Sequence, residues 1–294
     1  MAIDTLPPLR EVIAAHGLQA RKQLGQNFLL DLNLTARIAR TAGPLEGTTI
    51  IEVGPGPGGL TRALLAAGAR QVVAIERDER TLPALAQIAE AYPGRLEVLA
   101  ADALDVDYAA LADGPTRIVA NLPYNIATPL VAQCLLDTWS AMHGESGLCR
   151  FSRLTFTVQL EVAQRMAAGP GDEEYGPISV LAGLLGRMTV GPVIPATAFW
   201  PQPKVNSRIL RIDFDEQAAD RIKNAADLAQ IIFLAFNQRR KQIGPILQRR
   251  LEGATGADVE AALKLAGVEP QQRAQSIKPE QFMLIANSLP QTPR

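Results

Sequence analysis

Residues 50–61 read I-I-E-V-G-P-G-P-G-G-L-T, and this stretch decides the fold. A β-branched run ends at Val53, glycines occupy four of the next six positions, and an apolar helical pattern begins at Leu60. Glycine is needed where the backbone takes a positive φ or lies against a ligand, and a helix N-terminus directs free N–H groups to the same place. The stretch therefore predicts a strand, a tight loop and a helix that together bind a polar small molecule.

The loop alone does not identify that ligand. Gly54, Gly56 and Gly59 match the G-x-G-x-x-G spacing of dinucleotide-binding folds, so NAD(P) fits the pattern. Pro55 and Pro57 remove two amide donors, and no Gly-Lys-Ser/Thr follows, which argues against a triphosphate-binding P-loop.

Around this loop the hydrophobic pattern alternates between strand and helix. Strands are predicted at 48–53, 71–76, 95–100, 117–121, 152–158, 188–194 and 207–213. The first four are separated by helical patterns, which is typical of βαβ units and a parallel sheet. The last two flank a short loop without a helix and predict an antiparallel pair.

The segments on either side of the sheet read as helical. Residues 1–45 are predicted to form an N-terminal helical segment with helices at 9–16 and 32–41, the second capped by Asp31. Residues 46–215 then form the Rossmann-like domain. Residues 216–294 form a small all-α domain, with helices at 218–236, 238–251, 257–265 and 279–288.

Composition sets the broad class. The chain has 294 residues, of which 47% are hydrophobic and 20% charged, as in ordinary globular proteins of about two domains. A net charge of −1 gives no overall attraction to nucleic acid, so such contacts require local basic patches. Two cysteines and two histidines make a disulfide framework or a Cys/His metal site improbable. Without a signal-peptide pattern or a long apolar run, we expect a cytoplasmic protein with no membrane partner and no metal.

Polar residues end the first four predicted strands: Glu52, Glu76, Asp102 and Asn121. Because the carboxyl ends of parallel strands meet at one edge of a sheet, we expect these side chains to converge on one crevice. At Glu76 a carboxylate would accept hydrogen bonds from ribose hydroxyls, which both NAD and S-adenosylmethionine offer. Asp102 is suitably placed to accept from an adenine amino group. The set favours an adenosine ligand without naming it.

The motif N-L-P-Y, from Asn121 to Tyr124, points to a reaction. An exocyclic adenine amine is a poor nucleophile because its lone pair is delocalised into the ring. The Asn121 side-chain oxygen and the Leu122 carbonyl, held by the rigid Pro123, would accept its two N–H groups and favour a pyramidal nitrogen. Tyr124 offers a face on which the base can stack. No metal or histidine is needed, because a sulfonium already activates the methyl group.

Three further segments each allow two interpretations. Phe199, in F-W-P-Q-P-K-V-N-S, either sandwiches an extruded base opposite Tyr124 or packs under the hairpin. Residues 21–30, R-K-Q-L-G-Q-N-F-L-L, either cover the ligand or form a connector with Phe28 in the core. The basic run at 239–241 contacts RNA phosphates or is a solvated helix face.

Together, L-G-Q-N-F-L, the glycine stretch, the strand-end acids, N-L-P-Y-N-I-A-T-P-L and F-W-P-Q-P-K-V-N-S resemble the ribosomal RNA adenine dimethyltransferases, from about residue 21 to residue 287. The chain is most similar to the bacterial small-subunit branch. The resemblance implies an α/β, class I methyltransferase fold with a seven-stranded Rossmann-like sheet and a small all-α C-terminal domain. It also implies S-adenosylmethionine as methyl donor, and dimethylation of two adjacent adenines near the 3′ end of 16S rRNA during small-subunit maturation.

The resemblance also assigns residues. Donor contacts would be Asn27, Leu29, Gly54, Gly56, Glu76, Asp102 and Asn121. Catalytic residues would be Asn121, Leu122, Pro123, Tyr124 and Phe199. RNA contacts would be Arg21, Lys22, Lys204, Arg239, Arg240 and Lys241, in a protein that acts as a monomer. One departure is Gln242, where the family usually has Thr, followed by Gly244-Pro245, which we expect to interrupt the helix.

Three other functions remain open at this stage. Methylation of large-subunit rRNA, as in antibiotic-resistance relatives, uses the same N-L-P-Y chemistry, although the long C-terminal region favours the small subunit. A binding protein that retains the fold as an assembly or transcription factor is a second alternative. An NAD dehydrogenase is the weakest, because no proton-transfer histidine is evident near a substrate pocket.

Overall fold

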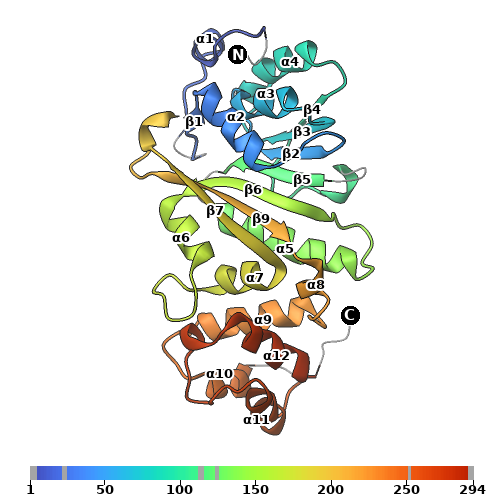
Figure 1. Cartoon of the computed structure of the whole chain (residues 1–294), viewed down its shortest axis with the longest axis vertical. Coiled ribbons are helices and arrows are strands. Elements are labelled where there is room, and N and C mark those ends of the chain that lie inside the picture. The colour runs from blue at the N-terminus through green and yellow to red at the C-terminus, as the bar shows by residue number, and fades with distance from the viewer. Residues whose placement is uncertain (1–4, 22–24, 112–115, 123–125, 251–252, 291–294) are drawn as a thin grey trace.

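A computed structural model of the chain describes residues 5–21, 25–111, 116–122, 126–250 and 253–290. In these residues seven strands form one mixed sheet with the order β4-β3-β2-β5-β6-β9-β7 (Figure 1). Its strands are β2 (Thr49–Val53), β3 (Gln71–Glu76), β4 (Leu96–Ala100), β5 (Thr116–Asn121), β6 (Phe151–Gln159), β7 (Gly186–Ile194) and β9 (Ser207–Phe214). All seven strands predicted from the pattern are confirmed, with ends that differ by at most two residues.

The direction of the strands places a crevice at the middle of the sheet. Strands β4, β3, β2, β5 and β6 run parallel, whereas β9 lies antiparallel between β6 and β7, which confirms the antiparallel pair. Within this sheet, β2 is the first strand in the sequence. The next two strands, β3 and β4, lie on one side of β2, and β5 then pairs with its other side. In an open α/β sheet, ligands bind where the order reverses in this way.

Helices cover both faces of the sheet. On one face lie α2 (Leu32–Thr41), α3 (Gly59–Ala66) and α4 (Leu82–Ala91); on the other lie α5 (Ala127–Met142), α6 (Leu160–Ala167) and α7 (Pro177–Leu185) (Figure 1). Successive residues of a strand point to opposite faces, so Ile50 packs under the first group and Ile51 under the second. This two-sided burial explains why the central strands read as continuous apolar runs.

The C-terminal region contains the helices α8 (Glu216–Ala219), α9 (Ala225–Phe236), α10 (Ile243–Arg250), α11 (Gly256–Leu265) and α12 (Pro279–Ser288). No strand follows Phe214 in the described part of the chain. One hydrophobic core runs without a break from Ile51 in the sheet to Val259 and Phe282 in these helices. A separate domain beginning at residue 216 stays a prediction.

Two expectations for the C-terminal region are wrong. The helix expected at 218–236 is divided into α8 and α9, with Asn224 capping α9 through its side chain. The helix expected from 238 begins only at Ile243, so Gly244 and Pro245 stand in its first turn. They do not interrupt the helix, because the first N–H groups of a helix have no intrahelical acceptor and the missing proline donor costs nothing there.

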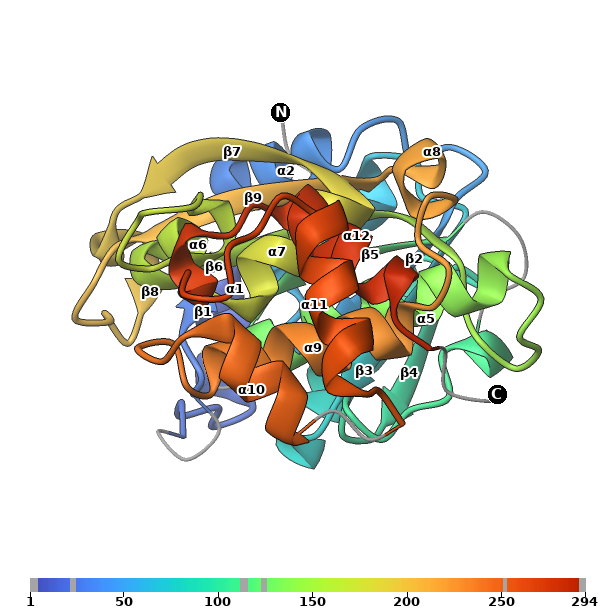
Figure 2. The same ribbon diagram turned by 90° about the horizontal axis from the view of Figure 1, so that it is seen from below.

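The sequence pattern did not reveal a second, two-stranded sheet. Strand β1 (Phe28–Leu29) pairs antiparallel with β8 (Phe199–Trp200), so that Phe28 lies opposite Trp200 and Leu29 opposite Phe199. Figure 2 shows both strands beside α1 (Leu9–Ala15). The pairing attaches the N-terminal segment to the loop between β7 and β9. None of the described helices is long and apolar enough to cross a bilayer.

Candidate active site

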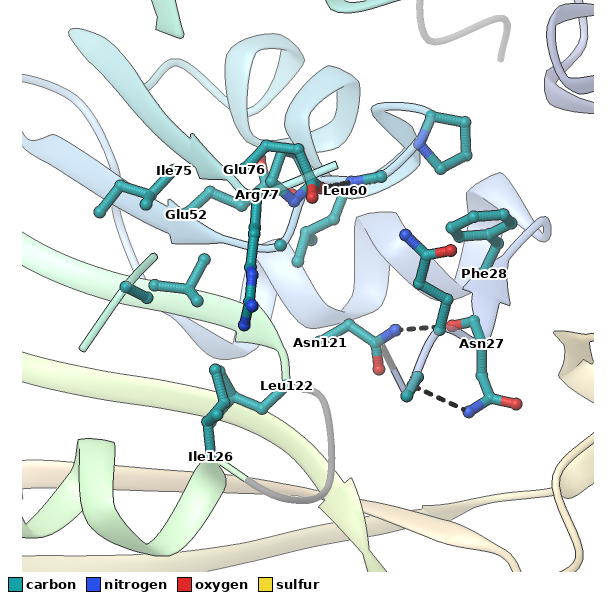
Figure 3. A pocket seen from close by; sticks show the side chains of 18 of the residues that line it. Asn27, Phe28, Glu52, Leu60, Ile75, Glu76, Arg77, Asn121, Leu122 and Ile126 are labelled. Carbon is teal, nitrogen blue, oxygen red and sulfur yellow. Dashed lines mark hydrogen bonds between the residues drawn. The ribbon is translucent and has the colours of Figure 1, made fainter. Parts of the chain in front are cut away.

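A cavity opens at the carboxyl ends of β2, β3 and β5, which is the crevice expected from the strand order (Figure 3). We call it the strand-end cavity. Its walls come from the segment 25–29, the loop that follows β2, and the residues that end β3, β4 and β5. All the predicted donor contacts line it: Asn27, Leu29, Gly54, Gly56, Glu76, Asp102 and Asn121. Their role in donor binding stays a prediction.

The glycine loop, residues 54–59, has a backbone that requires glycine. Gly54, Gly56 and Gly58 all have positive φ angles, of 68°, 55° and 85°. A Cβ on Gly58 would collide with Cδ1 of Ile88 in α4, and one on Gly56 would lie 3.0 Å from the Phe28 ring. The loop therefore lies close to the cavity without side chains between its backbone and a ligand.

Glu76 ties the glycine loop to the end of β3. Its Oε2 accepts a hydrogen bond from the Gly56 N–H at 2.9 Å, and its Oε1 accepts from the Asp78 N–H at 2.7 Å. Burial raises the pKa of this carboxyl, while the two backbone hydrogen bonds oppose that change. A carboxylate oxygen can accept more than one hydrogen bond, so Glu76 keeps acceptor capacity for a ribose diol at the cavity.

Glu52 is a buried acid with one oxygen unsatisfied among the described residues, although Thr61 forms hydrogen bonds with its carboxyl. It lies in β2 with only 1% of its surface exposed, and within the described residues its Oε2 has no hydrogen-bond partner. Burial raises the pKa of Glu52 to about 8, and the nearby charge of Glu76 adds to the effect. A buried carboxyl is stabilised by a cation or a donor beside it. A ligand with a positively charged group fits this wall of the cavity.

Asp102 follows β4 and is one third exposed. Its Oδ2 accepts from Nη1 of Arg77 at 2.9 Å, and its Oδ1 accepts from the Leu104 N–H at 3.1 Å. Arg77 also lines the cavity, and sequence reasoning missed it, although it directly follows Glu76. The expected contact between Asp102 and an adenine amino group stays a prediction.

Asn121, at the end of β5, is oriented by the backbone of the N-terminal segment. Its Nδ2 donates to the Asn27 carbonyl oxygen at 3.0 Å, and Figure 3 shows its oxygen turned away from that bond. Leu122 is buried, lines the cavity and donates its N–H to the Thr157 carbonyl at 3.1 Å. The hydrogen bond to Asn27 fixes the Asn121 amide, and no described residue donates a hydrogen bond to its Oδ1, as the expected chemistry requires. Pro123 and Tyr124 lie outside the described residues.

The N-terminal segment is held at a second point that sequence reasoning did not find. The Gln26 side chain donates to Oδ2 of Asp78 at 2.8 Å, just beyond the end of β3. Asp78 also accepts hydrogen bonds from Arg80, which, together with Gln26, lower its pKa to about 2. Phe28 is buried against α1 and α4, so it is a core residue, as the connector interpretation has it.

Phe199 does not face the strand-end cavity. Only 5% of its surface is exposed, and its side chain packs in the hydrophobic core. The next residue, Trp200, is 41% exposed. The structure therefore favours the packing interpretation for Phe199, and its role in sandwiching a base stays a prediction.

The predicted RNA contacts lie on the surface where the structure describes them. Arg21, Lys204, Arg239, Arg240 and Lys241 are exposed, and Lys22 lies outside the described residues. Arg21 adjoins the cavity wall, because its N–H donates to Oε1 of Gln26 at 2.8 Å. The run 239–241 forms the turn between α9 and α10, where Nη1 of Arg239 donates to the Glu173 carbonyl at 3.4 Å.

Metal ligands and disulfides are not found in the part of the chain that the structure describes. No group of three or more His, Cys, Asp or Glu side chains there could hold a metal ion. Cys134 and Cys149 are free thiols buried in the core.

Comparison with known proteins shows the relatives of this chain. Proteins named ribosomal RNA small subunit methyltransferase A are 51% identical in Cereibacter sphaeroides, covering 97% of this chain and 98% of the relative, and 50% identical in Sinorhizobium medicae, covering 98% and 99%. In structure the chain is similar to the 23S rRNA methyltransferase ErmE, with a TM-score of 0.63 and 29% identity over 90% of this chain and 99% of that one.

A dimethyladenosine transferase from Plasmodium falciparum has the same fold, with a TM-score of 0.65 and 21% identity over 85% of this chain and 93% of that one. The predicted fold class is therefore confirmed. The family model described as ribosomal RNA adenine dimethylase matches residues 17–291, almost the whole sequence. The chain belongs to the ribosomal RNA adenine dimethylase family.

Proposed function

We propose that the protein is an S-adenosylmethionine-dependent methyltransferase that dimethylates the N6 amines of two adjacent adenines near the 3′ end of 16S rRNA. This modification would form part of small-subunit maturation. The observation that carries the proposal is the Asn121 amide, which the Asn27 carbonyl orients at the edge of the strand-end cavity. Relatives of about 50% identity over almost the full length, named as small-subunit methyltransferases, support the choice of RNA.

The residues of the strand-end cavity fit the methyl donor. When bound, S-adenosylmethionine supplies an electrophilic methyl group on a positively charged sulfur. Glu76 would hold the ribose hydroxyls and Asp102 the adenine amino group. Glu52, whose Oε2 has no hydrogen-bond partner among the described residues, would hold the cationic end. The glycine loop allows the backbone to approach the ligand closely. Asn27 and Leu29 would close the cavity from the N-terminal segment.

The catalytic residues would position an amine without removing its proton. Asn121 Oδ1 and the Leu122 carbonyl would each accept one N–H of the target adenine, which returns lone-pair density to the nitrogen. The hydrogen bond to Asn27 stops the amide from turning its NH₂ group toward the base. Tyr124 would supply the stacking surface.

The proposal also covers the functional units of the chain, its oligomeric state and its localisation. We propose three functional units, with a donor-covering segment at 1–45, the catalytic domain at 46–215 and a C-terminal RNA-binding domain at 216–294. The protein would act as a monomer in the cytoplasm. Light scattering on the purified protein, with and without small subunits, tests the monomer.

The experiment that tests the function is methyl transfer from labelled donor to separated ribosomal subunits. We expect dimethyladenosine in small subunits, identified by mass spectrometry, and none in large subunits. The structural similarity to a 23S rRNA methyltransferase makes the large subunit the specific alternative. Product in large subunits alone would overturn the assignment.

A further inference from the structure

A second cavity lies near the strand-end cavity, since Leu29 lines the first and the next residue, Leu30, lines the second. It is formed by α1, the segment that follows α1, and the β1–β8 pair, and it is lined by Arg10, Ile13, Leu18, Gln19, Leu30 and Trp200, among others. We call it the Trp200 cavity. Phe28 lines the first cavity, and its ring centroid is 6.4 Å from that of Trp200, which lines the second.

Trp200 is held in an exposed position by its backbone. It pairs with Phe28 in the two-stranded sheet, and successive residues of a strand face opposite sides. Phe199 therefore points into the core, with 5% of its surface exposed, and Trp200 points outward, with 41% exposed. An indole fixed at the surface of a cavity offers an aromatic face on which a flat ligand can stack.

The position of Trp200 is linked to the catalytic amide through the chain itself. Its pairing partner, Phe28, directly follows Asn27, whose carbonyl holds Asn121. Trp200 is therefore connected to Asn121 through two neighbouring residues of one segment. The two cavities share no lining residue, so the Trp200 cavity is not the pocket in which the target adenine itself would lie.

The residues that line the Trp200 cavity indicate what kind of ligand it would bind. The walls are apolar and aromatic, Arg10 stands exposed at the rim, and no carboxylate is among its described lining residues. Exposed Arg21 and Lys204 lie on the two segments that carry β1 and β8. A planar apolar ligand that carries a negative charge suits this combination, and a nucleotide has both properties.

We propose that Trp200 is the stacking platform for an unpaired nucleobase that flanks the target adenine, with Arg10 contacting the phosphate of that nucleotide. The proposal rests on the proposed function, since it requires an RNA substrate. Trp200 would position the strand and take no part in methyl transfer. Its loss should therefore weaken substrate binding and leave the donor site intact.

Intrinsic fluorescence tests the contact directly, because the chain has two tryptophans in different environments. Trp139 is 3% exposed and its Nε1 donates to the Ala219 carbonyl, so acrylamide should quench Trp200 selectively. We expect a single-stranded RNA oligonucleotide with two adjacent adenines to protect the accessible fluorescence. The Trp200→Phe variant should lack that signal. Unchanged quenching of the wild-type protein at saturating RNA would overturn the proposal.

Kinetics provide the second test. Trp200→Ala should raise KM for small subunits about tenfold, the effect of losing one stacked base. The value of kcat and the donor affinity should stay unchanged, and Trp200→Phe should restore most of the KM. Arg10→Gln should weaken the salt dependence of KM. The matched control is Val205→Ala, at an exposed apolar residue of the same loop outside the cavity.

The outcomes separate this proposal from the proposed function. If the wild-type protein methylates small subunits and Trp200→Ala has the same KM as Val205→Ala, the stacking platform alone is wrong. If the wild-type protein methylates only large subunits, the proposed function is wrong. A raised KM on subunits without protection by the oligonucleotide would assign the cavity to a ribosomal protein instead. Trp200→Leu keeps an apolar side chain without an aromatic face and repeats the test if the alanine variant does not fold.

Discussion

The Gly56 N–H donates to Oε2 of Glu76 at 2.9 Å, so the carboxylate that ends β3 also fixes the loop that follows β2. One side chain thereby shapes both walls of the strand-end cavity. The two walls come from neighbouring strands that pair from Thr49 to Val53. A change at Glu76 should therefore affect ligand binding in two ways, by removing an acceptor and by releasing the loop.

Glu76→Ala should weaken the binding of S-adenosylmethionine by about 1 to 3 kcal/mol, the usual effect of losing hydrogen bonds to a charged group. Glu76→Gln keeps one oxygen acceptor and should lose less. Calorimetric titration measures both. Glu79→Ala is the matched control, since Glu79 is an exposed acid just after β3 and does not line the cavity. If the Glu76 and Glu79 variants bound S-adenosylmethionine with equal affinity, Glu76 would not be a donor contact.

Asn121→Ala removes the oriented acceptor and should lower kcat about a hundredfold at saturating donor and RNA, by analogy with the removal of one oriented group from a polar catalytic site. Asn121→Asp should be no better at neutral pH, because one carboxylate oxygen would face the Asn27 carbonyl where Nδ2 now donates at 3.0 Å. Single-turnover methyl transfer to small subunits measures the effect. Undiminished transfer by Asn121→Ala would contradict the mechanism.

Glu52 should make the stability of the donor-free protein depend on pH. Its pKa is raised from 4.5 to about 8 in the folded protein, mainly by burial, so the folded state binds the proton more tightly than the unfolded state. Stability must therefore fall as the pH rises from about 4.5 to about 8. Glu52→Gln removes this dependence and should gain up to a few kcal/mol relative to the wild-type protein at pH 8.5.

Denaturant unfolding of both proteins at pH 5 and pH 8.5 measures that difference. Acids that do not interact with Glu52 contribute equally to both proteins and cancel. Glu76 is coupled to Glu52, so the difference reports Glu52 together with this interaction. The same difference in stability between the two proteins at both pH values would show that Glu52 is not a perturbed acid.

Gly58→Ala should destabilise the fold by about 2 to 4 kcal/mol. One part is the cost of a Cβ at a φ of 85°, and the other is the collision with Ile88. Gly94→Ala separates the two parts, because Gly94 has a φ of 72° and open space around its Cα. Thermal unfolding should place the Gly94 variant between the wild-type protein and the Gly58 variant. If both variants were equally stable, the collision with Ile88 would make no contribution to the loss of stability.

Much of the fold was predictable from the sequence because its signals are local. The seven strands are apolar runs bounded by turn residues, and the Asp31 side chain caps α2 by accepting from the Asn33 N–H, as predicted. The cavity-lining residues at strand ends were predictable for a related reason. In a parallel sheet the position of a residue along its strand determines which edge it reaches.

The features that could not be predicted depend on distant pairs of backbone groups. The β1–β8 pair has only two residues in each strand, separated by 170 residues, and no periodicity shows in so short a segment. The Asn27–Asn121 contact uses a backbone carbonyl, which every residue has, so the sequence carries no sign of it. The choice between Phe199 and Trp200 as the exposed aromatic depends on that same pairing.

The unbroken core between the sheet layer and the C-terminal helices has a mechanical consequence. Tyr175 donates its hydroxyl to the Ile277 carbonyl at 2.9 Å, and Trp139 in α5 donates to the Ala219 carbonyl at 3.0 Å, so the helices beneath the sheet and the C-terminal helices share one packed interior. Such an interior resists deformation. We therefore expect the C-terminal helices to move together with the sheet layer and not independently of it.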